Sequence, residues 1–187
     1  MTNTSWSVRR LHTVSAVQLD ELANVLIDCV EGGASVSFLL PFGWDKARAF
    51  WAPMAGAVAN GERALLVAED SEGIFGTAQL LLAQPPNQPH RADVAKLLVH
   101  RRARRQGVAA ALMRAAETAA RDCGRSLLVL DTVTGGDAQR LYERLGWTRV
   151  GDIPGYALLP TGEPCSTTYY YRDLARAEPV GRAAHNA

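Results

Sequence analysis

The chain has 187 residues, of which 48% are hydrophobic, and a formal net charge of +1. This length and composition predict one globular domain with an ordinary apolar core. The near-neutral charge argues against a dedicated nucleic-acid-binding protein. No run approaches the roughly 20 apolar residues that cross a membrane, and the first residues contain no apolar signal-peptide core. We therefore expect a cytoplasmic protein that does not bind membranes.

The cysteines and histidines give no sign of a disulfide framework or a metal site. Cys29, Cys123 and Cys165 are far apart in the sequence and form no Cys-x-x-Cys pair. The histidines are scattered, with no spacing that would place two of them on one helix face. We expect free thiols in a reducing compartment and no bound metal.

The first half of the chain contains signals for strands and helices in alternation. Ser15 and Gln18 have the spacing of a capping box, which predicts the start of a helix. Pro53 falls inside a second helical pattern and is expected to kink or divide that helix. The predicted elements, in order, are a strand at 7–12, a helix from 15 to the glycines at 32 and 33, a helix at 44–60, and a hairpin of strands at 63–69 and 74–83.

In the second half, strand and helix patterns alternate in the manner of a βαβ unit. A strand at 94–99, a helix ending near 123 and a strand at 126–131 predict a right-handed crossover with parallel strands side by side. Asp137 is the predicted N-cap of a helix that ends near Gly146. Two further strands are predicted at 147–150 and 167–172. We expect residues 1–174 to form a single domain and residues 175–187 a disordered tail.

The stretch Val94–Leu112 has the pattern of an anion-binding site. A strand leads into a turn with four arginines and Gly107, after which a helix begins. The first N–H groups of a helix lack internal partners and carry a partial positive charge, so they bind phosphate readily. A Walker A loop is excluded because Val108 follows the glycine, and the three glycines of a dinucleotide fingerprint are missing. A solvated basic helix start remains the alternative.

A second group of candidate residues lies near the predicted carboxyl ends of the two parallel strands. Asp131 ends one strand, and Tyr142 belongs to the apolar face of the following helix. Ligands of open α/β sheets bind in the crevice at these strand ends. We therefore expect Gly107, Asp131 and Tyr142 to line one cleft. For each residue alone, a structural role as packing tyrosine or turn aspartate remains the alternative.

Two motifs carry a resemblance to a known family. Arg104–Ala109 resembles the Arg/Gln-x-x-Gly-x-Gly/Ala signature of the GCN5-related N-acetyltransferases, and Ala138–Trp147 resembles their Ala-x-x-Leu-Tyr-x-x-x-Gly-Phe signature. The resemblance implies an α/β fold with a central twisted mixed β-sheet flanked by helices, and acetyl-CoA as the acyl donor. The family often has Pro at the position of Arg101 and Asn at that of Gly135, so this sequence departs from it there.

The resemblance also implies roles for individual residues. Tyr142 corresponds to the family's general acid near the coenzyme sulfur, and a phenol with a pKa of about 10 is a suitable donor to a thiolate of about 8.5. Asp131 is the second catalytic candidate; its low ordinary pKa favours a role through water or as an electrostatic partner of the amine. Arg101, Arg102, Arg104 and Arg105 are expected to serve the coenzyme phosphates. The expected coenzyme-binding residues are Leu98, Val99, Arg104, Arg105, Gln106, Gly107, Val108 and Ala109, with an oxyanion donor near Leu98 or Val99.

The acceptor is predicted less sharply. Three further segments resemble the tabtoxin-resistance acetyltransferases: Gly32–Val36, Leu130–Thr132 and Thr148–Tyr156. Those enzymes acetylate an amino-acid-like β-lactam toxin, so the resemblance implies a role in antibiotic resistance. Glu31, Phe38 and Tyr156 are the candidate substrate-binding residues. We expect a small-molecule amine as substrate, no nucleic acid as partner, and a monomer or homodimer. A peptide or protein acceptor, an aminoglycoside acceptor, a non-catalytic acyl-CoA sensor and a nucleic-acid module with the arginines as its footprint remain alternatives.

Overall fold

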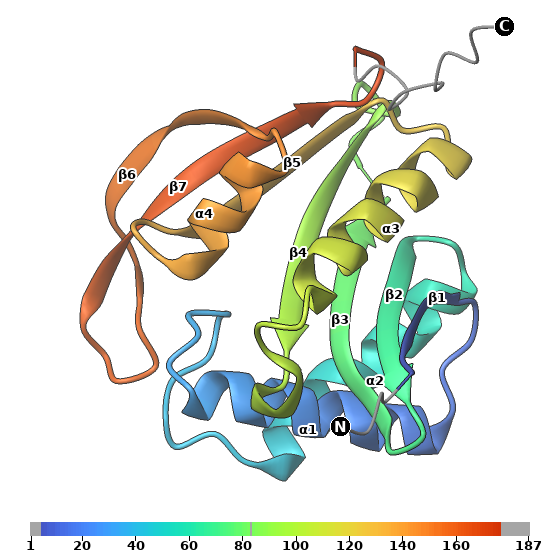
Figure 1. The fold of residues 1–187 in the computed structure, drawn as a ribbon, viewed down its shortest axis with the longest axis vertical. Coiled ribbons are helices and arrows are strands. Elements are labelled where there is room, and N and C mark those ends of the chain that lie inside the picture. Colours follow the sequence, from blue (N-terminus) through green and yellow to red (C-terminus); the bar gives the residue numbers. More distant parts are fainter. Residues whose placement is uncertain (1–4, 83, 177–187) are drawn as a thin grey trace, which may run out of the picture.

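A seven-stranded mixed sheet in the order β1-β2-β3-β4-β5-β7-β6 forms the centre of the protein (Figure 1). This computed structural model describes residues 5–82 and 84–176. Neighbouring strands are antiparallel except β4 and β5, which are parallel. The strands are β1 (Ser7–Leu11), β2 (Arg63–Asp70), β3 (Gly73–Leu81), β4 (Arg91–Val99), β5 (Leu127–Val133), β6 (Thr148–Leu158) and β7 (Pro164–Asp173).

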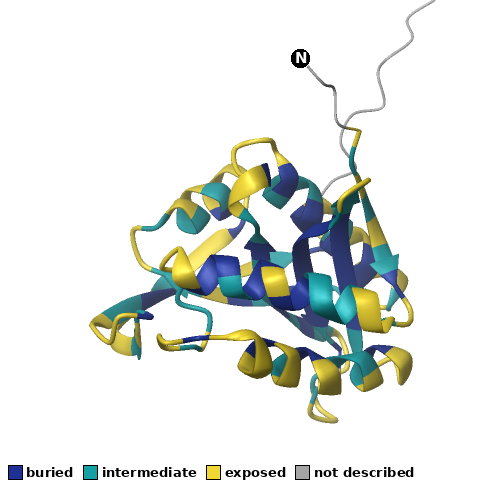
Figure 2. Ribbon diagram, turned by 90° about the horizontal axis from the view of Figure 1, so that it is seen from below, coloured by how far each residue is buried: buried dark blue, intermediate teal, exposed yellow. Residues whose placement is uncertain are grey.

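Helices cover both faces of the sheet, and the alternation of side chains along β2 shows how. Leu65 and Val67 pack into one apolar cluster with α1 and α2, whereas Leu66 and Ala68 pack into a second cluster with α3 and α4. This is the period of two that a strand buried on both faces requires. Figure 2 shows the buried residues concentrated in the strands and on the helix faces turned toward them. The helices are α1 (Ala16–Glu31), α2 (Trp44–Ala59), α3 (Val108–Asp122) and α4 (Asp137–Arg144), with a 3₁₀ turn at Arg101–Ala103.

Several sequence-based expectations are confirmed. The mixed α/β fold is the expected one, and the parallel β4 and β5 are joined through α3 as a βαβ unit. The capping box at the start of α1 forms: Ser15 Oγ accepts from the Gln18 N–H, and the Gln18 side chain accepts from the Ser15 N–H. The hairpin of β2 and β3 turns after Asp70, as the sequence predicted.

Two expectations about helices are revised. Of the two outcomes expected at Pro53, a division of the helix does not occur, because α2 runs unbroken from Trp44 to Ala59. Pro53 lies on the exposed side of that helix, where water can satisfy the carbonyl that proline leaves unpaired, and the buried Trp51 and Val58 hold the helix on either side of it. Asp137 is the first helical residue of α4 rather than its N-cap, because Gly136 has the extended backbone of the capping position.

The last hairpin is longer than predicted. β6 continues to Leu158 through Pro154 and Gly155, two residues that indicate a turn when read locally. β6 is the edge strand of the sheet, and its register against β7 shifts at two places, between Arg149 and Gly151 and between Ile153 and Ala157. Edge position and bulges are the circumstances in which a strand tolerates proline. The predictions for Ala83 and for the tail beyond residue 176 lie outside the described residues.

Candidate active site

A cleft opens where β4 and β5 separate. The two strands pair only from Arg91 to Asp93 with Leu127 to Val129, and beyond this point they diverge (Figure 1). The gap leads into a cleft of about 970 Å³ that is lined by residues of β4, β5, α3, α4 and the loop between α1 and α2. This volume is typical of a site for a small molecule or a coenzyme.

The start of α3 forms one wall of the cleft. Gly107 is the N-cap with a φ of 80°, and no side chain among the described residues caps the helix there. A Cβ on Gly107 would meet no atom within 4 Å, so a ligand has room to approach the backbone. Gly107, Val108 and Ala109 all line the cleft. The free N–H groups and the helix dipole therefore offer an anion site directly at the cleft wall.

The four arginines of the turn before α3 divide into two pairs. Arg104 and Arg105 line the cleft. Arg102 instead forms a double hydrogen bond to Asp70 and lies over the Phe75 ring, 4.7 Å from its centroid. Arg101 turns to Asp28 on α1. The expectation that all four serve coenzyme phosphates is therefore corrected: Arg101 and Arg102 hold the turn against its neighbours.

Gln106 also turns away from the cleft. Its side-chain amide donates to the Arg102 carbonyl at 3.1 Å, and Gln106 is not among the residues that line the cleft. The side chain of Gln106 therefore braces the turn. Its expected role in coenzyme binding stays a prediction, which the backbone of this residue, next to Gly107, would carry.

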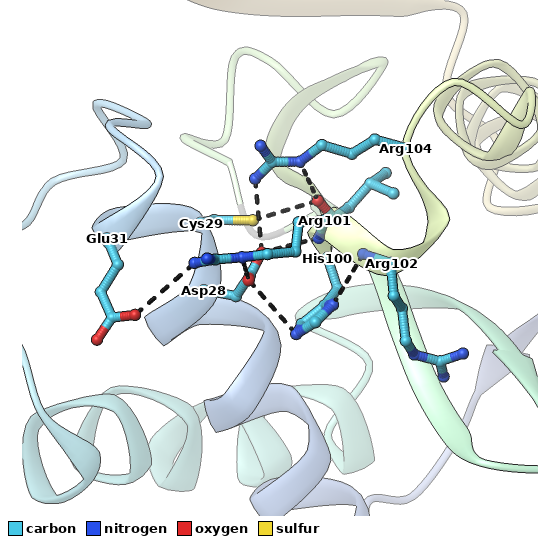
Figure 3. Close-up of polar contacts among 8 residues, drawn as sticks. Asp28, Cys29, Glu31, His100, Arg101, Arg102 and Arg104 are labelled. Carbon is cyan, nitrogen blue, oxygen red and sulfur yellow. Dashed lines mark hydrogen bonds and ion pairs between the residues drawn. The ribbon is translucent and has the colours of Figure 1, made fainter.

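A carboxylate on α1, which belongs to no recognised sequence motif, organises the turn. The side chain of Asp28 is 7% exposed and accepts from the Arg101 backbone N–H at 2.9 Å as well as from the Arg101 Nε (Figure 3). His100 Nε2 lies 3.4 Å and Arg104 Nη2 3.5 Å from the same carboxylate. The signal in the sequence is the position of Asp28 among the buried apolar residues of α1, where a carboxylate needs a partner. Asp28 thus joins α1 to the anion-binding turn.

Cys29 and Glu31 both lie near Asp28 at the end of α1, but only Cys29 lines the cleft. Cys29 lines the cleft, and its thiol is 3.6 Å from the Val99 carbonyl. Burial is the main cause that raises the pKa of this thiol. Glu31, a predicted acceptor-binding residue, lies outside the cleft and has Arg101 Nη2 at 3.8 Å (Figure 3). The residues that line the cleft therefore do not include Glu31, and its expected role in acceptor binding stays a prediction.

Tyr142 lies at the base of the cleft on α4. Its side chain packs between Trp147 and Tyr170, with ring centroids 5.9 Å from each, and only 5% of the residue is exposed. The residue lines the cleft, and no hydrogen bond within the described part of the chain is among the causes that shift the pKa of its hydroxyl. Burial, followed by the charge of Asp131, raises the pKa of Tyr142 well above its usual value. The phenol therefore keeps its proton to a higher pH than an ordinary tyrosine does.

Asp131 faces the same cleft from β5. Its Oδ2 lies 2.9 Å from the Thr167 hydroxyl, which is also 2.9 Å from the Thr132 carbonyl. The residue is exposed to the cleft and exerts its charge on Tyr142 and Lys96. Gly107, Asp131 and Tyr142 therefore line one cleft, as expected from their places at the strand ends.

The two candidate oxyanion donors differ in direction. The His100 N–H donates to the Phe75 carbonyl on β3 at 2.8 Å, and Val99 is directly opposite Gly76. Because the N–H groups of an antiparallel strand alternate in direction, the N–H of Val99 points away from β3 and toward the gap beside β5, whereas that of Leu98 points to β3. Both residues line the cleft, but only Val99 presents its N–H to it.

The far end of the cleft is closed by two segments that hydrogen-bond to each other. Ser35 Oγ donates to the Leu158 carbonyl at 2.9 Å, and the Leu40 N–H donates to the Pro160 carbonyl at 2.8 Å. The loop between α1 and α2 thereby meets the tip of the β6–β7 hairpin (Figure 1). Phe38 and Tyr156, both predicted acceptor-binding residues, line the cleft at this end.

The hydroxyl of Tyr156 is fixed by a second tyrosine. It lies 2.8 Å from the Tyr169 hydroxyl, and this hydrogen bond is the largest cause that raises the pKa of Tyr169 to about 12. Phe38 packs on Phe42 and Phe50, with ring centroids 4.5 Å and 5.3 Å apart. The two predicted acceptor-binding residues therefore sit in defined positions on opposite segments of the closed end.

Comparison with known proteins identifies the fold and the chemistry. The family model described as Acetyltransferase (GNAT) family matches residues 33–147, well over half of the chain. The chain belongs to this family. It is therefore an acetyl-CoA-dependent N-acyltransferase. The matched residues include the turn before α3, Asp131 and Tyr142.

Solved structures share the whole fold at low sequence identity. The N-acetyltransferase from Staphylococcus aureus Mu50 is 17% identical, with a TM-score of 0.75 over 91% of this chain and 99% of that one. The Salmonella typhimurium protein yncA, solved with its cofactor acetyl-CoA, is 17% identical, with a TM-score of 0.74 over 95% and 99%. The ribosomal-protein-alanine N-acetyltransferase from Brucella melitensis is 19% identical, with a TM-score of 0.75 over 90% and 99%.

The residues of the cleft fit the coenzyme that the GNAT family uses. A coenzyme diphosphate needs backbone N–H donors and a close approach, and the start of α3 supplies both at Gly107. Arg104 and Arg105 add positive charge beside it. In the described residues, no helix is long and apolar enough to cross a membrane, and no group of three or more metal-ligating side chains occurs.

Proposed function

We propose that this N-acetyltransferase moves the acetyl group of acetyl-CoA to the primary amine of a small, amino-acid-like molecule, by direct attack in a ternary complex. The closed far end of the cleft is the observation that carries this proposal. The hydrogen bonds from Ser35 to Leu158 and from Leu40 to Pro160 join the two segments that a polypeptide acceptor would have to pass between. A small amine fits within such an end, whereas a peptide chain needs an open groove.

The coenzyme would be held by the start of α3. The N–H groups of Gly107, Val108 and Ala109 would bind its diphosphate, with Arg104 and Arg105 as flanking cations. The Val99 N–H, which points into the gap between β4 and β5, would donate to the thioester oxygen as negative charge develops there. Val99 rather than Leu98 therefore takes the proposed oxyanion role.

Two side chains would move protons. Tyr142 would donate its phenolic proton to the departing thiolate, a role that its place at the base of the cleft supports. Its raised pKa keeps the phenol protonated until the thiolate forms, and it also makes Tyr142 a weaker acid than an ordinary tyrosine. Asp131 would attract the ammonium of the acceptor and orient a water molecule that carries its proton toward solvent. A carboxylate is a poor direct base for this proton, because its ordinary pKa is about 6 units below that of an alkyl ammonium. The attack forms the C–N bond of the amide and breaks the C–S bond of the thioester. The nitrogen loses two protons: one leaves through the water at Asp131, and the other restores the phenol of Tyr142 after it has protonated the thiolate.

Phe38 and Tyr156 would form the walls around the acceptor. Phe38 presents an aromatic face that is fixed by Phe42 and Phe50, and the Tyr156 hydroxyl is fixed by Tyr169. Both residues lie on the two segments that meet at the far end. Their substitution by alanine would raise the KM for the acceptor while leaving the KM for acetyl-CoA unchanged.

A thiol-release assay with acetyl-CoA tests the proposal. The acceptor panel contains free amino acids, β-lactam amino acids, simple primary amines, aminoglycosides and short peptides, some of which begin with alanine because the Brucella melitensis structure is described as acting on ribosomal-protein alanine. We expect turnover with one or more small amino-acid-like amines and none with peptides. Turnover confined to peptides would overturn the small-acceptor proposal, and coenzyme binding without turnover on any amine would favour an acyl-CoA sensor.

A further inference from the structure

We propose that Lys96 binds an anionic group of the acceptor, so that the cleft selects zwitterions whose amine faces Asp131 and whose carboxylate faces Lys96. Neither composition nor motif pointed to this lysine. The inference rests on the proposed function, since it concerns the acceptor end of the same cleft. It assigns Lys96 a role in specificity rather than in proton transfer.

A bulge in β4 directs Lys96 into the cleft. Ala95 is opposite Gln79 on β3, and Leu98 is opposite Thr77, so two residues of β4 occupy the space of one on its partner. Lys96 is in this bulge and has a φ of 52°, a conformation that side-chain-bearing residues seldom adopt. Bulges near active sites re-aim a side chain, and here the lysine lines the cleft.

The ammonium of Lys96 is held by neutral groups. It donates to the Val36 carbonyl at 3.0 Å and to Ser37 Oγ at 3.2 Å, both in the loop that closes the far end. The rings of Phe38 and Phe50 lie 5.9 Å and 5.4 Å from its nitrogen. An ammonium has three N–H donors, so one remains for a ligand.

The charge balance around Lys96 favours an anion. Across residues 5–82 and 84–176 the hydrogen-bond partners of this ammonium are a carbonyl and a hydroxyl rather than a carboxylate. Among the charges that shift its pKa, Asp131 raises it and Arg63 lowers it. Burial is the largest cause that lowers the pKa of Lys96, a sign that its charge is poorly solvated. A buried charge is costly unless it is paired, and a carboxylate of the acceptor would provide that pair.

Asp131 and Lys96 together define two subsites of opposite charge in one cleft. Asp131 is exposed to the cleft from β5, and Lys96 reaches it from β4, on the other side of the gap. A molecule that carries both an ammonium and a carboxylate complements both. A simple alkyl amine would satisfy Asp131 alone and leave Lys96 without a counter-charge.

Matched acceptors test the inference without any substitution. Each amino acid of the panel is compared with its carboxamide, which keeps the amine and removes the negative charge, in the thiol-release assay. We expect the acid to be preferred in kcat/KM by about 10- to 100-fold, the usual effect of a hydrogen bond to a charged group. Equal or better turnover of the carboxamides than of the amino acids would overturn the inference and leave the proposed function standing. Turnover confined to simple amines or aminoglycosides would overturn both. No turnover on any amine would instead overturn the proposed function, and the inference with it.

The variant K96M then assigns the preference to this residue. It should raise the KM for the amino acid and so remove most of the preference for the acid over the carboxamide. The kcat/KM for the carboxamide and the KM for acetyl-CoA should change little. The matched control is K46M, because Lys46 also donates to a loop carbonyl, that of Pro41, but lies outside the cleft. An equal loss of activity on acid and carboxamide in K96M would mean that Lys96 only supports the loop, and would overturn the inference.

Discussion

Replacement of Asp28 by asparagine should weaken both the fold and the binding of the coenzyme, because this carboxylate joins α1 to the anion-binding turn. The hydrogen bond from the Arg101 backbone N–H to the charged carboxylate is worth about 1.5 to 3 kcal/mol. His100, Arg101 and Arg104 are 29%, 59% and 43% exposed in their side chains, so each of their contacts adds at most about 1 kcal/mol. Asparagine keeps one acceptor oxygen, and we therefore expect a loss of about 3 kcal/mol in the free energy of unfolding.

Thermal unfolding measures the first effect of this substitution. For a chain of this length, about 3 kcal/mol corresponds to a fall in Tm of about 6 to 12 °C. The matched control is D20N on the same helix, where Asp20 pairs with Arg48 and both side chains are nearly half exposed. That variant should unfold within about 2 °C of the unchanged protein, because an exposed ion pair contributes little.

Isothermal titration with acetyl-CoA measures the second effect. Arg104 is held between the Val99 carbonyl and Asp28, so D28N frees its guanidinium. Fixing one such side chain on binding costs about 0.5 to 1.5 kcal/mol, which is about 2- to 10-fold in Kd. A D28N protein with the Tm and the Kd of the D20N control would refute the organising role of Asp28.

Three further predictions concern the proposed acid, Tyr142, and the coenzyme site at Gly107. Y142F should lower kcat about 100-fold or more with little change in coenzyme affinity. The control is Y170F, because the Tyr170 hydroxyl bonds Glu143 outside the cleft, and this variant should remain active. Equal kcat values for the two variants would refute the role of Tyr142 as the acid. Because burial raises the pKa of Tyr142 above its usual value of about 10, kcat should show no decline from loss of this proton up to pH 10, and a decline below pH 10 that disappears in Y142F would contradict this. G107D should abolish acetyl-CoA binding in titration calorimetry, while G61D, at a glycine of similar positive φ and equal open space away from the cleft, should bind normally; comparable binding by both would refute the anion site.

The sequence predicts best those features that depend on local pattern. The capping box before α1, the period of the helices and the turn after Asp70 are decided by residues a few positions apart, and the structure has all three. The parallel pairing of β4 and β5 follows from the strand–helix–strand order, since a crossover of this kind has one hand. The common cleft of Gly107, Asp131 and Tyr142 follows in turn from that pairing.

The features that the sequence did not predict are decided by distant partners. Four neighbouring arginines look equivalent in the sequence, but Asp28 and Asp70, far away in the chain, take Arg101 and Arg102 away from the cleft. The same pairing directs Glu31 to Arg101. Lys96 reaches the cleft because its strand forms a bulge against β3. No glycine or proline beside it in the sequence indicates a bulge at this position.

The placement of acetyl-CoA in a crystal of this protein is the most direct test of the account. The diphosphate should accept hydrogen bonds from the N–H groups at Gly107–Ala109, with the thioester sulfur within hydrogen-bond reach of the Tyr142 hydroxyl and the carbonyl oxygen at the Val99 N–H. A coenzyme bound elsewhere, or a sulfur remote from that hydroxyl, would contradict both the anion site and the proposed acid.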